Sequence, residues 1–133
     1  PEKDAKAAIQ LQQIFYRMTK YFIENFNTAN FLTEALYRSK AASYFTNYRV
    51  QHFIFIRTLI EQAQREGDIC SDMNSYEIYT TLQSILIQPI IIKNNILQQH
   101  KNEPLMDKLK LIDVSSESSL QKRLRIAFKG LRP

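Results

Sequence analysis

The chain has 133 residues and a formal net charge of +5, with two glycines, four prolines and one cysteine. This length suits a single domain able to bury about two-thirds of its unfolded surface. Few glycines and prolines disfavour a sheet with many tight turns, and a lone cysteine, Cys70, excludes an internal disulfide framework. We therefore expect one all-α domain over residues 1–133, located by default in the cytoplasm because no signal peptide is visible.

The first predicted helix runs from Glu2 to about Asn25. Its apolar side chains recur at helical spacing and form one face, made of Leu11, Ile14, Phe15, Met18, Phe22 and Phe26. A cluster of Asn and Thr at residues 27–30 then breaks the pattern and offers N-caps for a shorter helix from Phe31 to about Ala42. We expect this break to be a turn inside one domain.

A third helix is predicted from about Ser43 to Glu66. Its expected core face consists of Phe45, Tyr48, His52, Ile56, Leu59 and Ala63. Gly67 follows where a left-handed residue commonly ends a helix, and Ile69 can supply the accompanying hydrophobic contact.

The stretch from Ser75 to Leu97 is apolar on nearly every side. Its β-branched run is compatible with a strand, but Asn74 and Glu77 have the spacing of a helix capping box, so a helix is favoured. Pro89 then lies inside this helix and should kink it, because the carbonyl of Ile85 loses its usual donor. A membrane span is disfavoured by the polar residues that interrupt the stretch, which are Gln83, Ser84, Gln88 and Lys93.

Two apolar stripes run along this predicted helix. One contains Ile78, Leu82, Ile85, Pro89, Ile92 and Ile96, and the other contains Tyr79, Leu86, Ile90 and Leu97. One stripe can face the core of its own chain, whereas a second exposed stripe is unusual because each such side chain gains roughly 1.5–3 kcal/mol on full burial. We therefore expect a second subunit to cover one of them, and either stripe can take either side.

After a polar loop, Pro104 is expected to begin a short helix through Leu111. A last helix follows the capping residues Asp113, Ser115 and Ser116, and its apolar side holds Leu120, Leu124, Ala127, Phe128 and Leu131. Cations crowd the same segment, at Lys122, Arg123, Arg125, Lys129 and Arg132. We interpret them as a solvated face near a helix C-terminus, with direct phosphate binding as the alternative.

Side chains suited to catalysis or metal binding are few. His52 and His100 lie on different elements without partners at metal-ligand spacing, so we predict no enzyme, metal site or cofactor. Asp68 and Asp72 flank Cys70, and their charges disfavour its thiolate. The aromatic residues of the first and third helices form either solid core or the lining of a pocket for a small molecule. Our pocket candidates are Phe15, Met18, Phe22, Phe45, Tyr48, His52, Phe53 and Gln83.

The segment LIEQAQREGDICSDMNSYEIYTTLQSIL resembles the ligand-binding region of TetR-type transcriptional regulators. In that family a long helix ends at a glycine, followed by a small hydrophobic and then an acidic residue, and here Gly67, Ile69 and Asp72 stand in those places. The closing LQKRLRIAFKGLRP is similar to the family's last helix, which often stops at Gly-Leu, here Gly130 and Leu131. The opening helix and NTANFLTEAL resemble the family more loosely.

The resemblance implies a bundle of about five to six helices with an effector pocket enclosed mainly by the first, third and 75–97 helices. It also implies a homodimer in which the last two long helices form a four-helix interface. Our candidates for that interface are Tyr79, Leu86, Ile90, Leu120, Leu124 and Phe128. The family's N-terminal helix-turn-helix has no counterpart here, and the chain starts at Pro1 without a methionine.

We therefore expect the effector-binding and dimerisation domain of a longer repressor, which contacts DNA only through that missing N-terminal domain. The alternative is a helical protein–protein scaffold domain with no ligand pocket.

Overall fold

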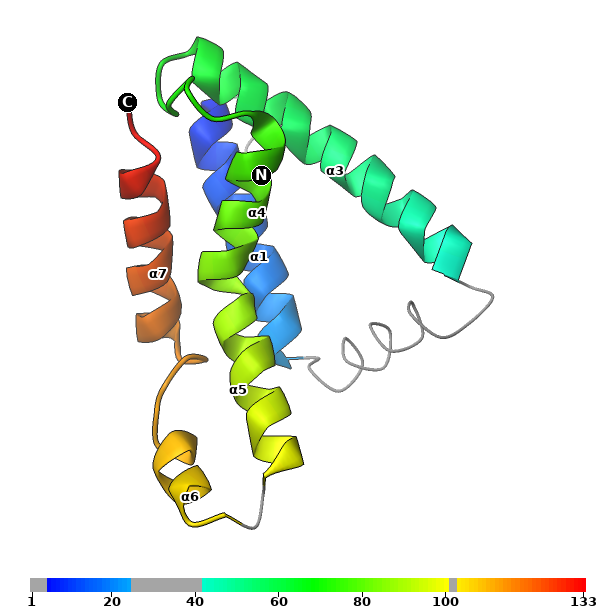
Figure 1. Cartoon of the computed structure of the whole chain (residues 1–133). Helices are drawn as coiled ribbons and strands as arrows, with labels where there is room; N and C mark the ends of the chain where they lie inside the picture. Colours follow the sequence, from blue (N-terminus) through cyan, green and yellow to red (C-terminus); the bar gives the residue numbers. More distant parts are fainter. Residues whose placement is uncertain (1–4, 25–41, 101–102) are drawn as a thin grey trace.

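The computed structural model describes residues 5–24, 42–100 and 103–133. Within these ranges the chain forms six helices and no strand, which confirms the predicted all-α bundle of five to six helices (Figure 1). The helices are α1 (Ala7–Glu24), α3 (Ala42–Arg65), α4 (Ser75–Leu86), α5 (Gln88–Gln99), α6 (Leu105–Lys110) and α7 (Glu117–Gly130). The short helix predicted from Phe31 lies outside the described residues.

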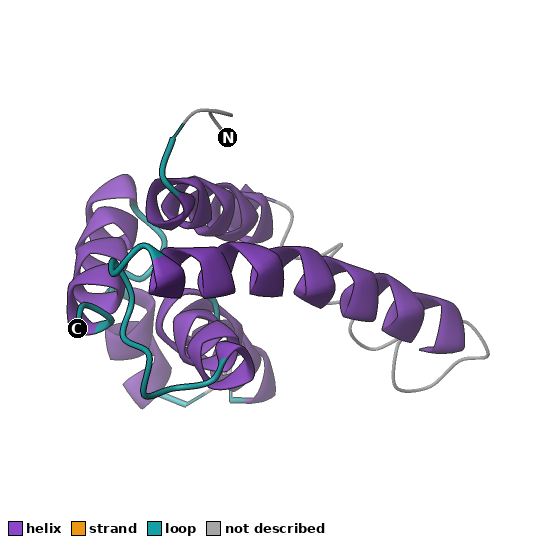
Figure 2. Cartoon of the chain, turned by 90° about the horizontal axis from the view of Figure 1, so that it is seen from above, coloured by secondary structure: helices purple, strands orange, loops and turns teal. Residues whose placement is uncertain are grey.

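The helices divide into a body and an arm. The body consists of α1, α3, α4 and α7, where α1 contacts each of the other three and α4 also packs on α3 and α7. The arm consists of α5 and α6, which extend beyond the end of the body in Figure 1, with α5 continuing on from α4. Viewed from above, one end of α3 also extends past the other helices (Figure 2).

The core of the body is built from residues spaced three or four apart on each helix. Side chains with at most 1% exposure come from all four body helices, and include Leu11, Phe15, Ile56, Ile60, Ile78, Leu82 and Leu120. Thr19 continues the buried row of α1, and its hydroxyl donates to the Phe15 carbonyl at 2.7 Å, so that its polar atom is satisfied. The apolar side predicted for the last helix is confirmed in full, because all five of its residues are buried.

The connection from α3 to α4 follows the predicted helix ending. Gly67 has a φ of 83°, and the Ala63 carbonyl accepts from the backbone N–H groups of Asp68 at 3.0 Å and Ile69 at 3.3 Å. Ile69 is 1% exposed and joins the core as predicted. The Cys70 N–H donates to the Leu131 carbonyl at 2.7 Å, which fastens this loop to the end of α7.

The helix predicted over residues 75–97 is two helices, and this corrects the single kinked helix expected from sequence. Its start is as predicted, since Asn74 and Glu77 form both hydrogen bonds of a capping box. The break lies at Ile87, two residues before Pro89, because proline has no N–H to give the Ile85 carbonyl. The Ile90 N–H donates to Ile87 at 3.1 Å instead of to Leu86, which frees the Leu86 carbonyl.

Arg123 of α7 supplies a donor to the backbone carbonyl that is left unpaired at this break. Its Nη2 donates to the Leu86 carbonyl at 3.1 Å, and its Nη1 donates to the Ser119 hydroxyl at 2.6 Å. Burial lowers the pKa of the Arg123 guanidinium, although Asp113 opposes that effect. A cation from a distant helix therefore stabilises the joint between body and arm.

Other helix ends differ from prediction by a few residues. Helix α1 begins at Ala7 rather than Glu2, and the side chain of Gln10 donates back to the Ala5 carbonyl at 2.8 Å. Helix α5 runs through Gln99, where the His100 N–H closes its last turn, so the following loop is shorter than expected. Pro104 caps α6 instead of opening it. The start of α7 is as predicted, since it follows Ser116, whose hydroxyl accepts from the Ser119 N–H.

The start of α7 is also joined to α1. Glu117 accepts from the Tyr16 hydroxyl at 2.8 Å and pairs with the Lys20 ammonium at 3.2 Å. Both bonds are exposed, so they add little stability, but they fix the register between the two helices. Across the described ranges, no helix combines the length and apolar character that a bilayer span requires.

Candidate functional site

The predicted pocket region holds a cluster of aromatic rings centred on Tyr79 of α4. The Tyr79 ring centroid lies 5.2 Å from that of Phe53 in α3 and 6.2 Å from that of Phe15 in α1. Phe53 also meets Tyr76 at 5.9 Å, and all three contacts are edge-to-face, at interplanar angles of 61° to 81°. These rings, from three helices, form the aromatic cluster.

One polar side chain bonds to the aromatic cluster, and a partly buried histidine is next to one of its rings in the sequence of α3. The Gln83 side-chain amide donates to the Tyr79 hydroxyl at 2.9 Å, since residues four apart on α4 share a face. His52, beside Phe53 on α3, has a buried Nε2 that makes no hydrogen bond with any described residue. Burial lowers the pKa of His52, so its imidazole is neutral near pH 7, and Nε2 can act as a donor or as an acceptor according to the tautomer.

The structure brings together part of the predicted pocket. Phe15, Phe53 and Gln83 meet around Tyr79, although Phe15 is fully buried and lies beneath that ring as core. Met18 and Phe22 are partly buried against the core. Of the other three pocket candidates, all in α3, His52 is described above, whereas the side chains of Phe45 and Tyr48 lie outside the described part of the structure. Tyr76 was not among the predicted pocket residues, although it lies three residues before Tyr79 and so shares a helix face with it.

Most of the predicted dimer residues lie inside the subunit's own core. Leu86 and Leu120 are 0% exposed and Ile90 is 1% exposed, and the other two, Leu124 and Phe128, are also buried. Tyr79 is engaged with the aromatic cluster. These side chains therefore have little area left for a partner, and the dimer itself stays a prediction. The same helices still expose other aliphatic side chains, namely Ile92, Ile96 and Ile126.

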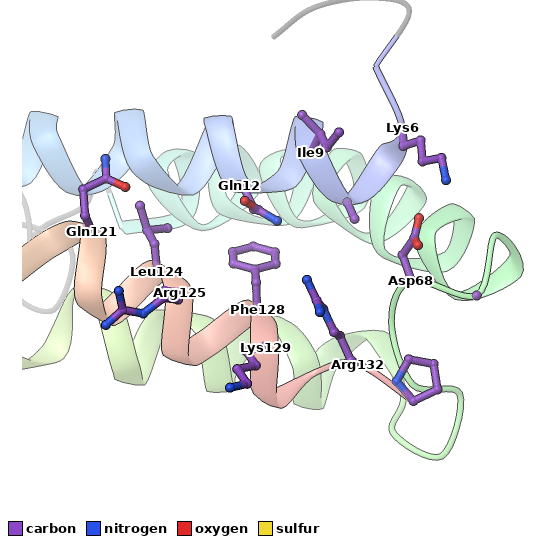
Figure 3. Close-up of a pocket in the computed structure, with 13 residues that line it drawn as sticks. Lys6, Ile9, Gln12, Asp68, Gln121, Leu124, Arg125, Phe128, Lys129 and Arg132 are labelled. Carbon is purple, nitrogen blue, oxygen red and sulfur yellow. The ribbon is translucent and has the colours of Figure 1, made fainter.

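A second candidate site is a groove of about 760 Å³ between α1, α7 and the Gly67 loop. Figure 3 shows the Phe128 ring lying between the two helices, with Arg132 and Asp68 toward one end. Leu124 and Ile9 add apolar lining, and four cations surround it, at Lys6, Arg125, Lys129 and Arg132. We call this the basic groove.

The sequence pattern did not predict the basic groove, because the residues that line it are distant from one another in the chain. Three of the cations recur at the spacing of one helix face, namely Arg125, Lys129 and Arg132. The sequence showed them as part of a cluster of basic residues near the C-terminus. No local pattern places Lys6 of the N-terminal segment or Asp68 of the α3–α4 loop beside them. Only the packing of α1 on α7 makes the groove.

Reactive and metal-binding groups do not gather at either site. Within the described residues, no three His, Cys, Asp or Glu side chains are placed to hold a metal ion. Desolvation raises the pKa of the Cys70 thiol, and the neighbouring Asp72 carboxylate raises it further, so the unreactive thiol form is favoured.

The chain gave no match to a family model, to a characterised protein or to a solved structure. The likeness to TetR-type regulators therefore rests on the residues quoted above.

Proposed function

We propose that this chain is the ligand-binding and dimerisation domain of a TetR-type transcriptional regulator. Its effector is a small, largely apolar molecule bound among α1, α3 and α4, and a DNA-binding head outside this chain responds to it. The observation that carries the proposal is the aromatic cluster, in which three helices present edge-to-face rings beside the Tyr79–Gln83 pair. On α3, the buried Nε2 of His52, the residue before Phe53, makes no hydrogen bond with a described residue. Apolar walls with a few polar groups are typical of small-molecule sites.

The chemistry of the cluster selects the kind of effector. The neutral imidazole of His52 can hydrogen-bond one polar group of a ligand and supplies no charge at pH 7. The ring edges favour contact with an aromatic face. The expected effector is therefore neutral and aromatic, with one or two polar atoms.

The proposed mechanism is a population shift in a homodimer. A ligand that favours one arrangement of two subunits changes the distance between two DNA-binding heads, which must match half-sites about one helical turn apart. The exposed Ile92, Ile96 and Ile126 of α5 and α7 are the surface that we assign to the second subunit. Such a regulator acts as a repressor in the cytoplasm.

A thermal-shift screen with neutral aromatic compounds tests the effector site. Compounds that raise the melting temperature of the wild-type chain are then tested on Phe53→Ala and on Phe55→Ala. Phe53 belongs to the aromatic cluster, whereas Phe55 lies on the same helix and is 55% exposed, so it is the matched control. The shift should be lost in Phe53→Ala and kept in Phe55→Ala, and equal shifts in both variants would place the ligand elsewhere.

A protein–protein scaffold is the second candidate, favoured by the apolar surface of the arm. Leu105 and Leu111 are 71% and 85% exposed, which is unusual for two leucines of one short segment. Light scattering separates the two candidates in part. A regulator domain should be dimeric at micromolar concentration, whereas a scaffold domain without its partner should be monomeric and give no hit in the thermal-shift screen.

A further inference from the structure

We infer that the basic groove binds an organic anion with an apolar body, such as a single-chain fatty carboxylate. This inference is independent of the proposed effector site, because the groove lies between α1 and α7, whereas the aromatic cluster joins α1, α3 and α4. The groove volume of about 760 Å³ lies within the range of about 300–1,000 Å³ that is common for small-molecule sites.

The charge of the groove selects an anion. Among the residues that line it, Lys6, Arg125, Lys129 and Arg132 are basic and Asp68 alone is acidic. None of the four cations forms an ion pair within 4.0 Å with another residue in the described ranges. A ligand carboxylate can therefore pair with them without displacing an existing partner.

Asp68 fixes where the charged head of the ligand lies. One oxygen of its carboxylate, Oδ2, is buried and accepts no hydrogen bond from the described residues. Because that negative charge lies at the Gly67 end of the groove, it repels an anion there. The ligand head is therefore placed beside Arg125 and Lys129, which lie one turn apart on α7.

The floor of the groove selects an apolar body. Phe128 and Leu124 lie between the cations and α1, each with 8% of its surface exposed, and Ile9 of α1 is 46% exposed. Most of the apolar surface that remains exposed there belongs to Ile9, and an alkyl chain laid along the groove removes it from water, which inorganic phosphate cannot do. A nucleic-acid backbone would use the cations but leave the apolar floor uncovered.

Calorimetry with decanoate, below its micelle concentration, tests the inference. The wild-type chain should bind decanoate more tightly than acetate, inorganic phosphate or decanol, because each of these lacks either the chain or the charge. The double variant Arg125→Gln/Lys129→Gln should bind decanoate about tenfold more weakly. The control Arg17→Gln/Lys122→Gln removes the same charge from α1 and α7 outside the groove, and it should bind like the wild type.

Several outcomes would overturn the inference. One is equal loss in both double variants, which would mean that net charge alone attracts the ligand. Another is phosphate binding as tightly as decanoate. A third is a groove-dependent affinity for a short DNA duplex or for phosphatidylglycerol vesicles that exceeds the affinity for decanoate. Phe53→Ala separates this inference from the effector proposal, because decanoate binding should persist in that variant.

Discussion

The body and the arm are built from similar apolar sequences but bury them very differently. In the body, Leu82 is 0% exposed because α1, α3 and α7 surround α4. In the arm, Ile92 is 53% exposed and Leu111 is 85% exposed, since the main packing contacts of α5 among the described helices are with α4 and α6. The comparison teaches that helical periodicity specifies which residues share a face, whereas the number of neighbours decides whether that face is buried.

The joint between the two regions explains why they differ. The break at Ile87 ends α4, and it leaves the Leu86 carbonyl to Arg123 of α7. After its first turn, which holds the buried Ile90, α5 passes the end of the body formed by α1 and α7 (Figure 1). The arm's aliphatic side chains therefore remain available to a partner.

The largest expected effect is at the root of the arm. Ile90→Glu places a charge at a site that is 1% exposed, so we expect the free energy of unfolding to fall by about 3 kcal/mol or more. Ile92→Glu lies two residues on at an exposed site, and the monomer should keep its stability. Thermal unfolding by circular dichroism measures stability, and light scattering measures assembly.

These two variants also locate the partner surface. Dissociation of a dimer by Ile92→Glu with an unchanged fold would assign α5's exposed side to the second subunit. Wild-type stability and assembly in Ile90→Glu would contradict the burial described for α5.

A matched pair of leucines measures the difference between the regions directly. Leu82→Ala removes a fully buried side chain from the body and should lower the free energy of unfolding by about 2–5 kcal/mol. Leu111→Ala, in the arm, should change it by less than about 0.5 kcal/mol. Urea unfolding gives both values. Comparable losses in the two variants would mean that the arm is covered in solution, for example by a second subunit.

Arg123 tests the joint itself. Arg123→Met removes the donor to the Leu86 carbonyl and should cost about 1–3 kcal/mol, because that carbonyl loses its partner at the break. Arg125→Met changes the same charge at an exposed position two residues on and is the control. If urea unfolding showed equal stability for the two variants, the guanidinium would have no special role at the break.

The smallest expected effect is the pH dependence that His52 gives to the body. Its pKa is lowered by burial in the folded state, so the unfolded chain binds the proton more readily. Stability from this group is complete above the unfolded pKa of about 6.5 and is lost as pH falls toward the lower folded pKa. When the pH falls from about 7.5 to about 5.5, the melting temperature of the His52→Gln variant should therefore decrease less than that of the wild type. Equal losses would assign the effect to other groups.

The sequence by itself determined the local features of this protein. The bounds of α3, the capping box at Asn74, the left-handed Gly67 and the apolar side of α7 were all predictable. Each depends on hydrogen bonds, backbone preferences and side-chain spacing among residues that are close together in the chain. Such preferences act before any tertiary contact forms.

Only the tertiary structure decided which apolar residues are covered and where the sites lie. Along residues 75–97 the buried row passes from Ile78 and Leu82 to Leu86 and Ile90, so it crosses from one predicted stripe to the other within α4, before the break at Ile87. Arg123 at the joint, the rings around Tyr79 and the basic groove each join residues far apart in the chain. The spacing of apolar residues along one helix does not specify which other helices pack against it. These features could therefore be identified only in the packed fold.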